Sequence, residues 1–422
     1  MPSFITFGCW NNLFYKERCS SSDPCYRDIV IDALGNYTRF NAVTDIMISG
    51  DNYYQNKIKF EIDGDDKQYN QVIIDDIISG FSQLRKAVPD IIPIHMVYGN
   101  HDLLSVNESF IIEEAYSSNE YNKDNLPRPT EDEYLDKCVI RDVENSAAAR
   151  NDIKLGFNYF SVYGKHTLVL MIDTSIYSDE FEKIELCYDD SSNQEDLRMG
   201  QNSAVMEFIG EHLHSGHNHS HSHSHIKNII VIGHHPIVYR KFKKGKKGKD
   251  GKKDKPGSNI VNYEPKLAEL FVQINGLLSG QQIHYLCADF HVFAKGVVTI
   301  TGSGAGAGTT TVNQYIVGTG GAKLDVLPKE GVNDGPFTDG IRYEPISGRS
   351  EHGFLVCNDN ETGDFTFEFI GIGPVIGPVI GPIIGHSHGK GKKRKTNKRR
   401  SYRYNSKSKS KSKSKSRRRI RR

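Results

Sequence analysis

The sequence predicts an α/β protein built as a four-layer sandwich, in which two mixed β-sheets face each other and helices cover the outer faces. Three observations lead to this fold class. Short apolar runs recur along residues 1–370, the early runs alternate with helix-like stretches, and the later runs follow one another closely. Alternating strands and helices favour parallel pairing, whereas consecutive strands favour antiparallel pairing. Together they indicate a pair of mixed sheets rather than a closed barrel.

The expected strands are short apolar runs of the length that a buried strand needs. They lie at residues 4–7, 42–48, 92–97, 159–163, 166–172, 229–232, 283–287, 297–300, 314–317, 353–356 and 365–370. Two helices are expected at 71–86 and 266–278. In the first of these, apolar residues recur at helical spacing, at Val72, Ile73, Ile77, Ile78, Phe81 and Leu84. A chain of 422 residues can bury a substantial core around these elements.

The charge of the chain divides it into an acidic body and a basic end. Residues 386–422 hold 19 Lys and Arg and no Asp or Glu, so the whole-chain charge of +2 leaves residues 1–385 at −17. We expect one globular domain over 1–370, a Gly/Pro/Ile linker over 371–385 and a disordered basic tail over 386–422. The tail is either a solubilising segment or an arm that binds nucleic acid non-specifically through phosphate contacts.

Two low-complexity insertions interrupt the predicted domain. Residues 212–225 contain seven histidines, and residues 240–257 are rich in Lys and Gly. The histidine run either stores metal ions or is a surface loop that binds them adventitiously. The Lys/Gly insertion either attracts anionic substrates through its charge or is a solvated loop.

The beginning of the chain reads as a strand and not as a signal peptide, because it has no basic segment followed by a long apolar one. No run is long enough to span a membrane. Seven scattered cysteines demand no disulfide framework, although Cys19 and Cys25 can pair, so we expect an intracellular, reducing location. The biased insertions and the Lys-Ser-Arg tail resemble those of giant-virus proteins, which extends the expected locations to the nucleus or a virion.

Four polar clusters, each directly after a predicted strand, carry side chains that suit metal ions. They are Gly50-Asp51-Asn52-Tyr53-Tyr54, Gly99-Asn100-His101-Asp102, Gly233-His234-His235-Pro236 and Ala288-Asp289-Phe290-His291. Each alone also suits a turn. Strand ends of α/β sheets converge on one crevice, and Asp, Asn, Tyr and His bind hard to borderline metals. The clusters therefore predict a metal pair, which serves phosphoryl chemistry.

In this order, the clusters resemble the metallophosphoesterase (calcineurin-like phosphoesterase) superfamily over about residues 4–300. The Gly-Asp-x-x-Tyr spacing, together with Tyr159-Phe160 and Leu170-Met171-Ile172-Asp173-Thr174, is most similar to the purple acid phosphatase branch.

The resemblance implies two metal ions, of Fe, Zn or Mn. It implies that Asp51 bridges them, that Tyr54 and His291 bind the first, and that Asn100 and His234 bind the second. His101 would act as general acid or as a clamp on the phosphoryl oxygens. The implied activity is hydrolysis of a phosphate ester, most simply a monoester, by metal-bound hydroxide.

Two positions depart from the family pattern. Cys9 stands where the family has Asp, and Asp289 stands where it has the first His of Gly-His-x-His. Cys9 is either a thiolate ligand, which favours Zn²⁺, or a small buried apolar residue. Asp289 is either a ligand or a loop residue.

The departures leave two alternatives to the enzyme. One is a catalytically impaired relative that binds nucleic acid or phosphorylated partners through its basic segments. The other is a structural component of a virion or of chromatin.

Overall fold

The protein is described from a computed structural model in which the chain divides into two compact units, Met1–Pro374 and Val375–Arg422. The described residues all belong to the first unit and are 3–11, 25–53, 66–103, 139–179, 181, 184–188, 193–214, 225–243, 258–302, 308–327, 335–338, 340–360 and 362–373. The predicted basic tail, most of the predicted linker and the centres of both insertions lie outside the described residues.

The first sheet has six strands in the order β16-β15-β1-β2-β3-β4. β1 to β4 are parallel, and β15 and β16 add on as an antiparallel edge. Their bounds are β1 Ser3–Phe7, β2 Val43–Ser49, β3 Ile94–Val97, β4 Ile153–Gly156, β15 His352–Asp359 and β16 Phe365–Ile372.

The second sheet has eight strands in the order β13-β14-β11-β12-β10-β7-β6-β5. At its centre β6, β7, β10 and β12 are parallel, and antiparallel strands flank them on both sides. Their bounds are β5 Tyr159–Tyr163, β6 Thr167–Met171, β7 Asn228–Ile232, β10 Gln282–Cys287, β11 Phe293–Thr301, β12 Thr309–Val317, β13 Gly335–Thr338 and β14 Ile341–Arg349. A separate hairpin pairs β8 (Val238–Lys243) with β9 (Ser258–Tyr263).

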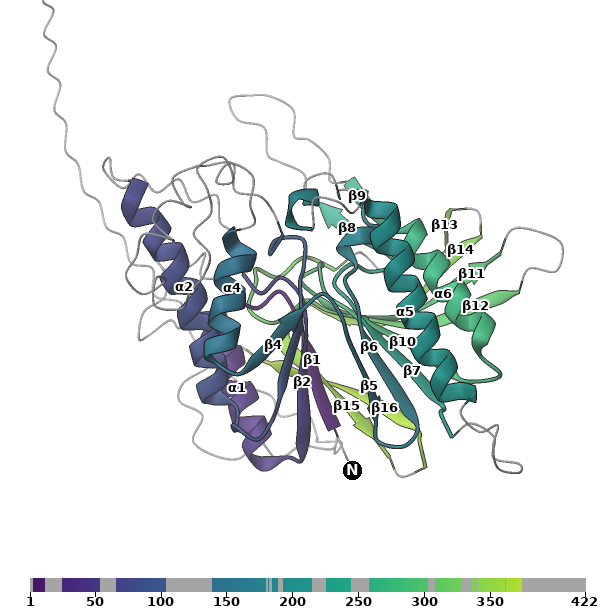
Figure 1. The fold of residues 1–422 in the computed structure, drawn as a ribbon, viewed down its shortest axis with the longest axis horizontal. Helices are drawn as coiled ribbons and strands as arrows, with labels where there is room; N and C mark the ends of the chain where they lie inside the picture. The colour runs from purple at the N-terminus through teal and green to yellow at the C-terminus, as the bar shows by residue number, and fades with distance from the viewer. Residues whose placement is uncertain are drawn as a thin grey trace, which may run out of the picture. The chain divides into compact units, whose positions relative to one another are not determined.

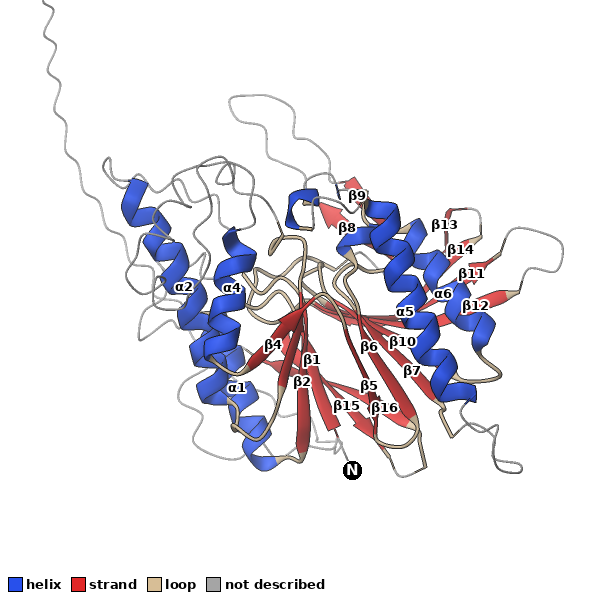
Figure 2. Cartoon of the chain, viewed as in Figure 1, coloured by secondary structure: helices blue, strands red, loops and turns tan. Residues whose placement is uncertain are grey.

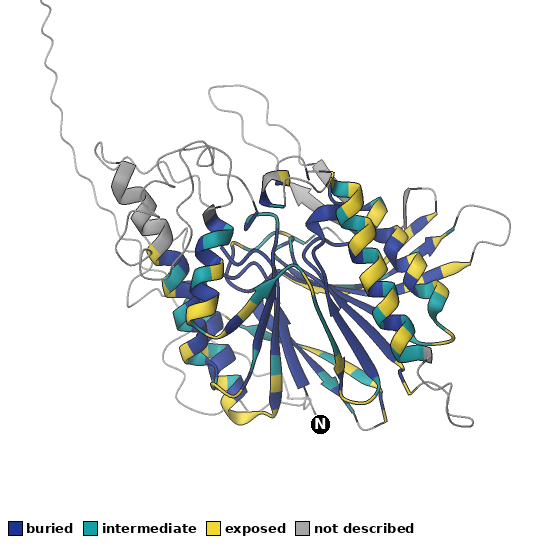
Figure 3. Ribbon diagram, in the orientation of Figure 1, coloured by how far each residue is buried: buried dark blue, intermediate teal, exposed yellow. Residues whose placement is uncertain are grey.

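Helices cover the outer face of each sheet, so the predicted four-layer α/β sandwich is confirmed (Figures 1 and 2). Beside the six-stranded sheet lie α1 (Tyr26–Phe40), α2 (Asp66–Ala87) and α4 (Val139–Arg150). Beside the eight-stranded sheet lie α5 (Gln194–His214) and α6 (Pro265–Leu277). The helices expose their outward faces, whereas the central strands are buried (Figure 3).

Strand β7 shows why the central strands read as unbroken apolar runs. Ile229 and Val231 pack in the cluster that includes Leu270 and Phe271 of α6. Ile230 and Ile232 pack in the cluster between the sheets, with Phe4 of β1. Successive side chains point to opposite faces of a strand, and both faces of this sheet are covered, so neither face tolerates polar residues.

The elements that the sequence did not predict are mostly polar on one face or short. β14 exposes most of its residues, and β4 has only four. β16 runs to Ile372, so the ordered strand takes in the first two residues of the predicted linker. Among the described cysteines, Cys9, Cys287 and Cys357 are not in disulfides, whereas Cys25 and Cys187 each are, contrary to the expectation of reduced thiols. No helix of the described part of the chain is long and apolar enough to cross a membrane.

The imidazole of His284 is buried between the two sheets. His284 of β10 is 5% exposed, and its ring centroid lies 4.8 Å from that of Phe367 on β16. Among the described residues, neither ring nitrogen has a hydrogen-bond partner. Burial, and then the charge of Lys295, lowers the pKa of His284 to about 4.

The lowered pKa of His284 predicts a loss of stability in acid. Because the unfolded chain protonates this histidine near pH 6.5 and the folded chain only near 4, its contribution is intact above pH 6.5 and falls as the pH drops toward 4. Between pH 7.5 and pH 5, we expect the free energy of unfolding to fall by about 1 to 2 kcal/mol less in His284→Phe than in the wild type. Urea unfolding at the two pH values measures this. His225→Ala, at an exposed histidine, is the control; equal losses in wild type and His284→Phe would contradict the prediction.

Candidate metal centre

The carboxyl ends of the parallel strands of both sheets meet at one place. The backbone N–H of Gly8, after β1, donates to the carbonyl of Val317 at the end of β12 over 3.0 Å. Nδ1 of His234, after β7, donates to the carbonyl of Ser49 at the end of β2 over 2.9 Å. These bonds hold the loops after β1 and β2 of the first sheet against the loops after β7 and β12 of the second.

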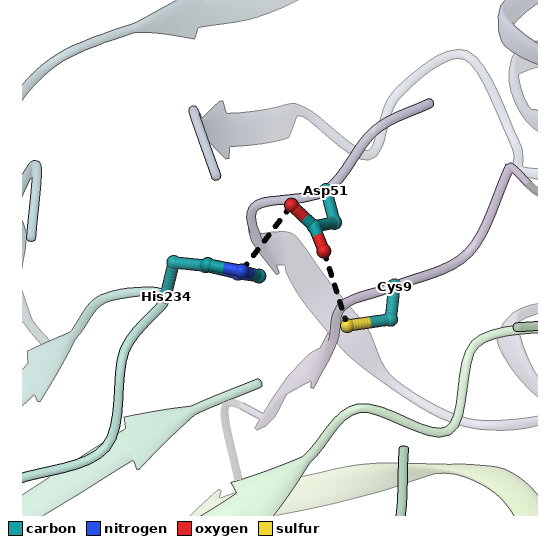
Figure 4. A group of neighbouring side chains, drawn as sticks. All are labelled: Cys9, Asp51 and His234. Carbon is teal, nitrogen blue, oxygen red and sulfur yellow. Dashed lines mark hydrogen bonds and ion pairs between the residues drawn. The ribbon is translucent and has the colours of Figure 1, made fainter. Parts of the chain in front are cut away.

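Three potential ligands for a metal ion come together there: Cys9 after β1, Asp51 after β2 and His234 after β7 (Figure 4). One ligand atom of each lies within 4.8 Å of the others, and all three residues are buried. Sγ of Cys9 is 3.8 Å from Oδ2 of Asp51, and Nε2 of His234 is 3.2 Å from Oδ1 of Asp51. The two carboxylate oxygens of Asp51 thus face different partners.

The orientation of His234 leaves its second nitrogen facing acceptors. Because a carbonyl only accepts, the bond to Ser49 fixes the proton of the neutral ring on Nδ1. Nε2 then faces Oδ1 of Asn100 at 3.1 Å and Oδ1 of Asp51 at 3.2 Å. Burial lowers the pKa of His234, but the Asp51 carboxylate raises it more, and the result is about 9. The position therefore attracts positive charge, either a proton or a metal ion.

Two glycines let the loops after β2 and β3 approach this closely. A Cβ on Gly99 would lie 2.3 Å from the backbone N and from Oδ1 of Asp51. Gly50 has φ +84°, and a Cβ there would lie 2.7 Å from the backbone N of Gly99. Larger residues at either position would separate the two loops.

Backbone strain is concentrated at this place. Among the described residues, four residues other than glycine have positive φ, and three of them are Cys9 at 55°, Asp51 at 51° and Asp289 at 52°. Such conformations cost on the order of 1 kcal/mol each and are kept where the surrounding structure imposes them. Each of these three residues is the first polar residue after a strand, and its positive φ sets the direction of its side chain.

The carboxylate of Asp102 joins the loops after β2 and β3. Its Oδ1 accepts from the backbone N–H of Asn52 at 2.8 Å and of Tyr53 at 3.1 Å, and its Oδ2 accepts from the backbone N–H of Gly99 at 2.8 Å and from Nδ2 of Asn52 at 2.9 Å. Burial, and then the Asp51 carboxylate, raises the pKa of Asp102, while the N–H donors act in the opposite direction. Asp102 is part of the second predicted cluster, but the sequence pattern assigns it no role.

Glu144 of α4 is a second buried acid beside Asp102. It is fully buried, and within the described part of the chain neither of its carboxyl oxygens has a hydrogen-bond donor. Burial, and then the charge of Asp102, raises the pKa of Glu144 well above its usual range, so the site favours the protonated form of this acid.

The loop after β7 is held by Thr174, which follows β6. Its Oγ1 accepts from the backbone N–H of His234 at 3.0 Å and of His235 at 2.9 Å, and it lies 3.0 Å from Nδ1 of His235. Burial, and then the neighbouring His234, lowers the pKa of His235 to about 3, so His235 is neutral. Thr174 directly follows a predicted strand and Asp173. This position after a strand is the sequence feature that could have indicated its role.

The structure gathers some of the predicted site residues and not others. Asn100 joins Cys9, Asp51 and His234. His101 is partly exposed beside them, and its backbone N–H donates to Oδ1 of Asp51 at 3.1 Å. Within the described residues, neither Asp289 nor His291 belongs to the close cluster. Nδ1 of His291 bonds to the carbonyl of Lys323 at 2.8 Å. Tyr54 lies outside the described residues.

Similarity to known proteins is found among solved structures but not among family models or curated proteins. No family model matches the chain, and no curated protein matches it. Solved structures do match, among them one titled "Structure of PhoD", which is 10% identical with a TM-score of 0.38. The match covers 84% of this chain, and the chain spans 63% of that structure's length. A likeness this weak carries no functional conclusion, so the function rests on the geometry of the site.

The four bonds to Asp102 predict that Asp102→Asn damages both stability and the metal centre. Whichever way the amide faces, its NH₂ group meets two N–H donors. We expect a loss of about 2 to 4 kcal/mol in the free energy of unfolding and at least about tenfold weaker Zn²⁺ binding, measured by urea unfolding and by calorimetry. Asp90→Asn, at a fully exposed side chain, is the control. Wild-type stability in Asp102→Asn would show that these bonds do not hold the loops.

Proposed function

We propose that the chain is a metal-dependent phosphohydrolase whose active site is the meeting point of the strand ends. The observation that carries the proposal is the convergence of Nε2 of His234 with Oδ1 of Asn100 and Oδ1 of Asp51 in a buried place. Neutral imidazole, amide oxygen and carboxylate oxygen all offer lone pairs at about 3.1 to 3.2 Å. Ligand atoms on one ion in tetrahedral or octahedral geometry lie about 2.9 to 3.4 Å apart.

A second ion is part of the proposal because Asp51 presents its other oxygen toward a different side. Oδ2 faces Cys9 and not His234. A carboxylate can bridge two ions in this way, and two-ion sites serve in-line displacement at phosphorus. Ions held here, which we propose to be Zn, Fe or Mn, would supply positive charge for the phosphoryl oxygens and acidify a water.

His101 stands at the exposed rim of the same place and is the proposed group that meets the substrate. Its backbone is fixed by the bond to Asp51, and the residue as a whole is partly exposed, although Nδ1 of its ring is buried. From that position a histidine can hold a phosphoryl oxygen or deliver a proton to the leaving alcohol. We propose monoesters as the substrate class.

The test is hydrolysis by protein whose metal content is known. Protein stripped with chelator and reloaded with Zn²⁺, Mn²⁺ or Fe²⁺ should hydrolyse p-nitrophenyl phosphate faster than bis(p-nitrophenyl) phosphate. Asp51→Asn and His234→Ala should lower kcat/KM at least about 100-fold, because loss of even an outer partner of a ligand costs about 10- to 100-fold. Asp90→Asn is the matched control. A chain that elemental analysis shows to be loaded and that hydrolyses neither ester would refute the proposal.

We also propose that residues 386–422 bind nucleic acid, on the strength of 19 cationic and no acidic side chains in that segment. Phosphate contacts of this kind release counterions, so affinity for a DNA duplex should fall steeply between about 50 and 200 mM salt. Deleting residues 386–422 should abolish the binding and leave ester hydrolysis unchanged. Retention of salt-sensitive binding by the truncated chain, measured by fluorescence anisotropy, would contradict this assignment.

A further inference from the structure

The sulfur of Cys9 is placed as a ligand atom would be. It lies 3.8 Å from Oδ2 of Asp51, in the buried cluster with His234. Zn–S and Zn–O bonds of about 2.3 and 2.1 Å at a tetrahedral ion put sulfur and oxygen about 3.6 Å apart. An ion can therefore join the two atoms with a shift of only a few tenths of an ångström.

The backbone of Cys9 is fixed from both sides. Its N–H donates to the carbonyl of Gly50 at 3.1 Å, and its carbonyl accepts from the N–H of Ala322 at 2.9 Å. Its φ of 55° is a conformation that a cysteine adopts at a cost, and it is shared with Asp51. The structure thus holds the side chain of residue 9 toward Asp51.

The competing role for Cys9 is that of a small apolar residue. On one side it does pack with Ala288 and Ala322. That role explains its burial. As a thiol, Cys9 also donates a hydrogen bond to Oδ2 of Asp51, and a bound ion would take the place of that proton between the two atoms. A thiolate beside Asp51 needs a cation between them, because two adjacent negative charges out of water are otherwise very unfavourable.

We propose that Cys9 binds a metal ion as a thiolate together with Oδ2 of Asp51, and that this makes the centre select thiophilic ions such as Zn²⁺ over Mn²⁺ and Mg²⁺. Thiolates favour Zn²⁺, whereas sites with only oxygen ligands suit Mg²⁺ and Mn²⁺. On binding, the S–H proton leaves to solvent and the sulfur lone pair forms the bond to the ion. This inference rests on the proposed function and adds a ligand and a metal preference to it.

The test is a titration of the stripped full-length chain with Co²⁺, followed by absorption. Cobalt in a protein site gives visible d–d bands, and a thiolate ligand adds an intense near-ultraviolet charge-transfer band. We expect both in the wild type. Cys9→Ser should lose the charge-transfer band, keep the d–d bands and bind Zn²⁺ at least about tenfold more weakly, with little change in Mn²⁺ affinity. Cys357→Ser, at another buried cysteine that is not in a disulfide, should match the wild type.

The outcomes separate the two claims. To keep the histidine run from contributing d–d bands, every protein carries serine at the histidines of residues 217–223. Wild-type d–d bands without a charge-transfer band would overturn the role of Cys9 and leave the metal-dependent function standing. A spectrum of aqueous Co²⁺ alone would overturn both. Because the wild-type spectrum decides the ligand by itself, the result does not depend on whether Cys9→Ser folds.

Discussion

The buried carboxylate of Asp51 is the group around which the rest of the site is arranged. Only 1% of the residue is exposed, and its oxygens face the backbone N–H of His101, Nε2 of His234 and Sγ of Cys9. A carboxylate taken out of water costs several kcal/mol unless donors or cations compensate. Those partners follow β3, β7 and β1, so one side chain requires strand ends of both sheets to meet.

A second feature of the site is that buried acidic groups lie close together. Asp102 and Glu144 are fully buried near Asp51, and the Asp102 carboxylate is balanced by N–H donors rather than by a cationic side chain. Such an arrangement lowers stability, and the positive φ values at Cys9, Asp51 and Asp289 lower it further. Unfavourable features that gather at one end of two sheets are typical of a functional site, and a bound cation would offset the charge.

The sequence predicted most central strands and the polar residues that follow them, because both signals are local. Buried strands such as β7 must be apolar on both faces, and Asp51, Asn100 and His234 follow directly. The residues that hold these side chains were missed. Thr174, Asp102 and the carbonyl of Ser49 act on loops 50 or more positions away, or across the two sheets, and no local pattern encodes such contacts. Nor could spacing show which of the predicted ligands belong to the close cluster within the described residues.

We propose that strand ends of both sheets build a metal centre at Asp51. Anomalous scattering at the zinc edge, from crystals grown with Zn²⁺, tests it most directly. We expect an anomalous peak within bonding distance of Asp51, Asn100 and His234. Zinc peaks confined to the histidine run, with none at Asp51 in a well-ordered crystal, would contradict it.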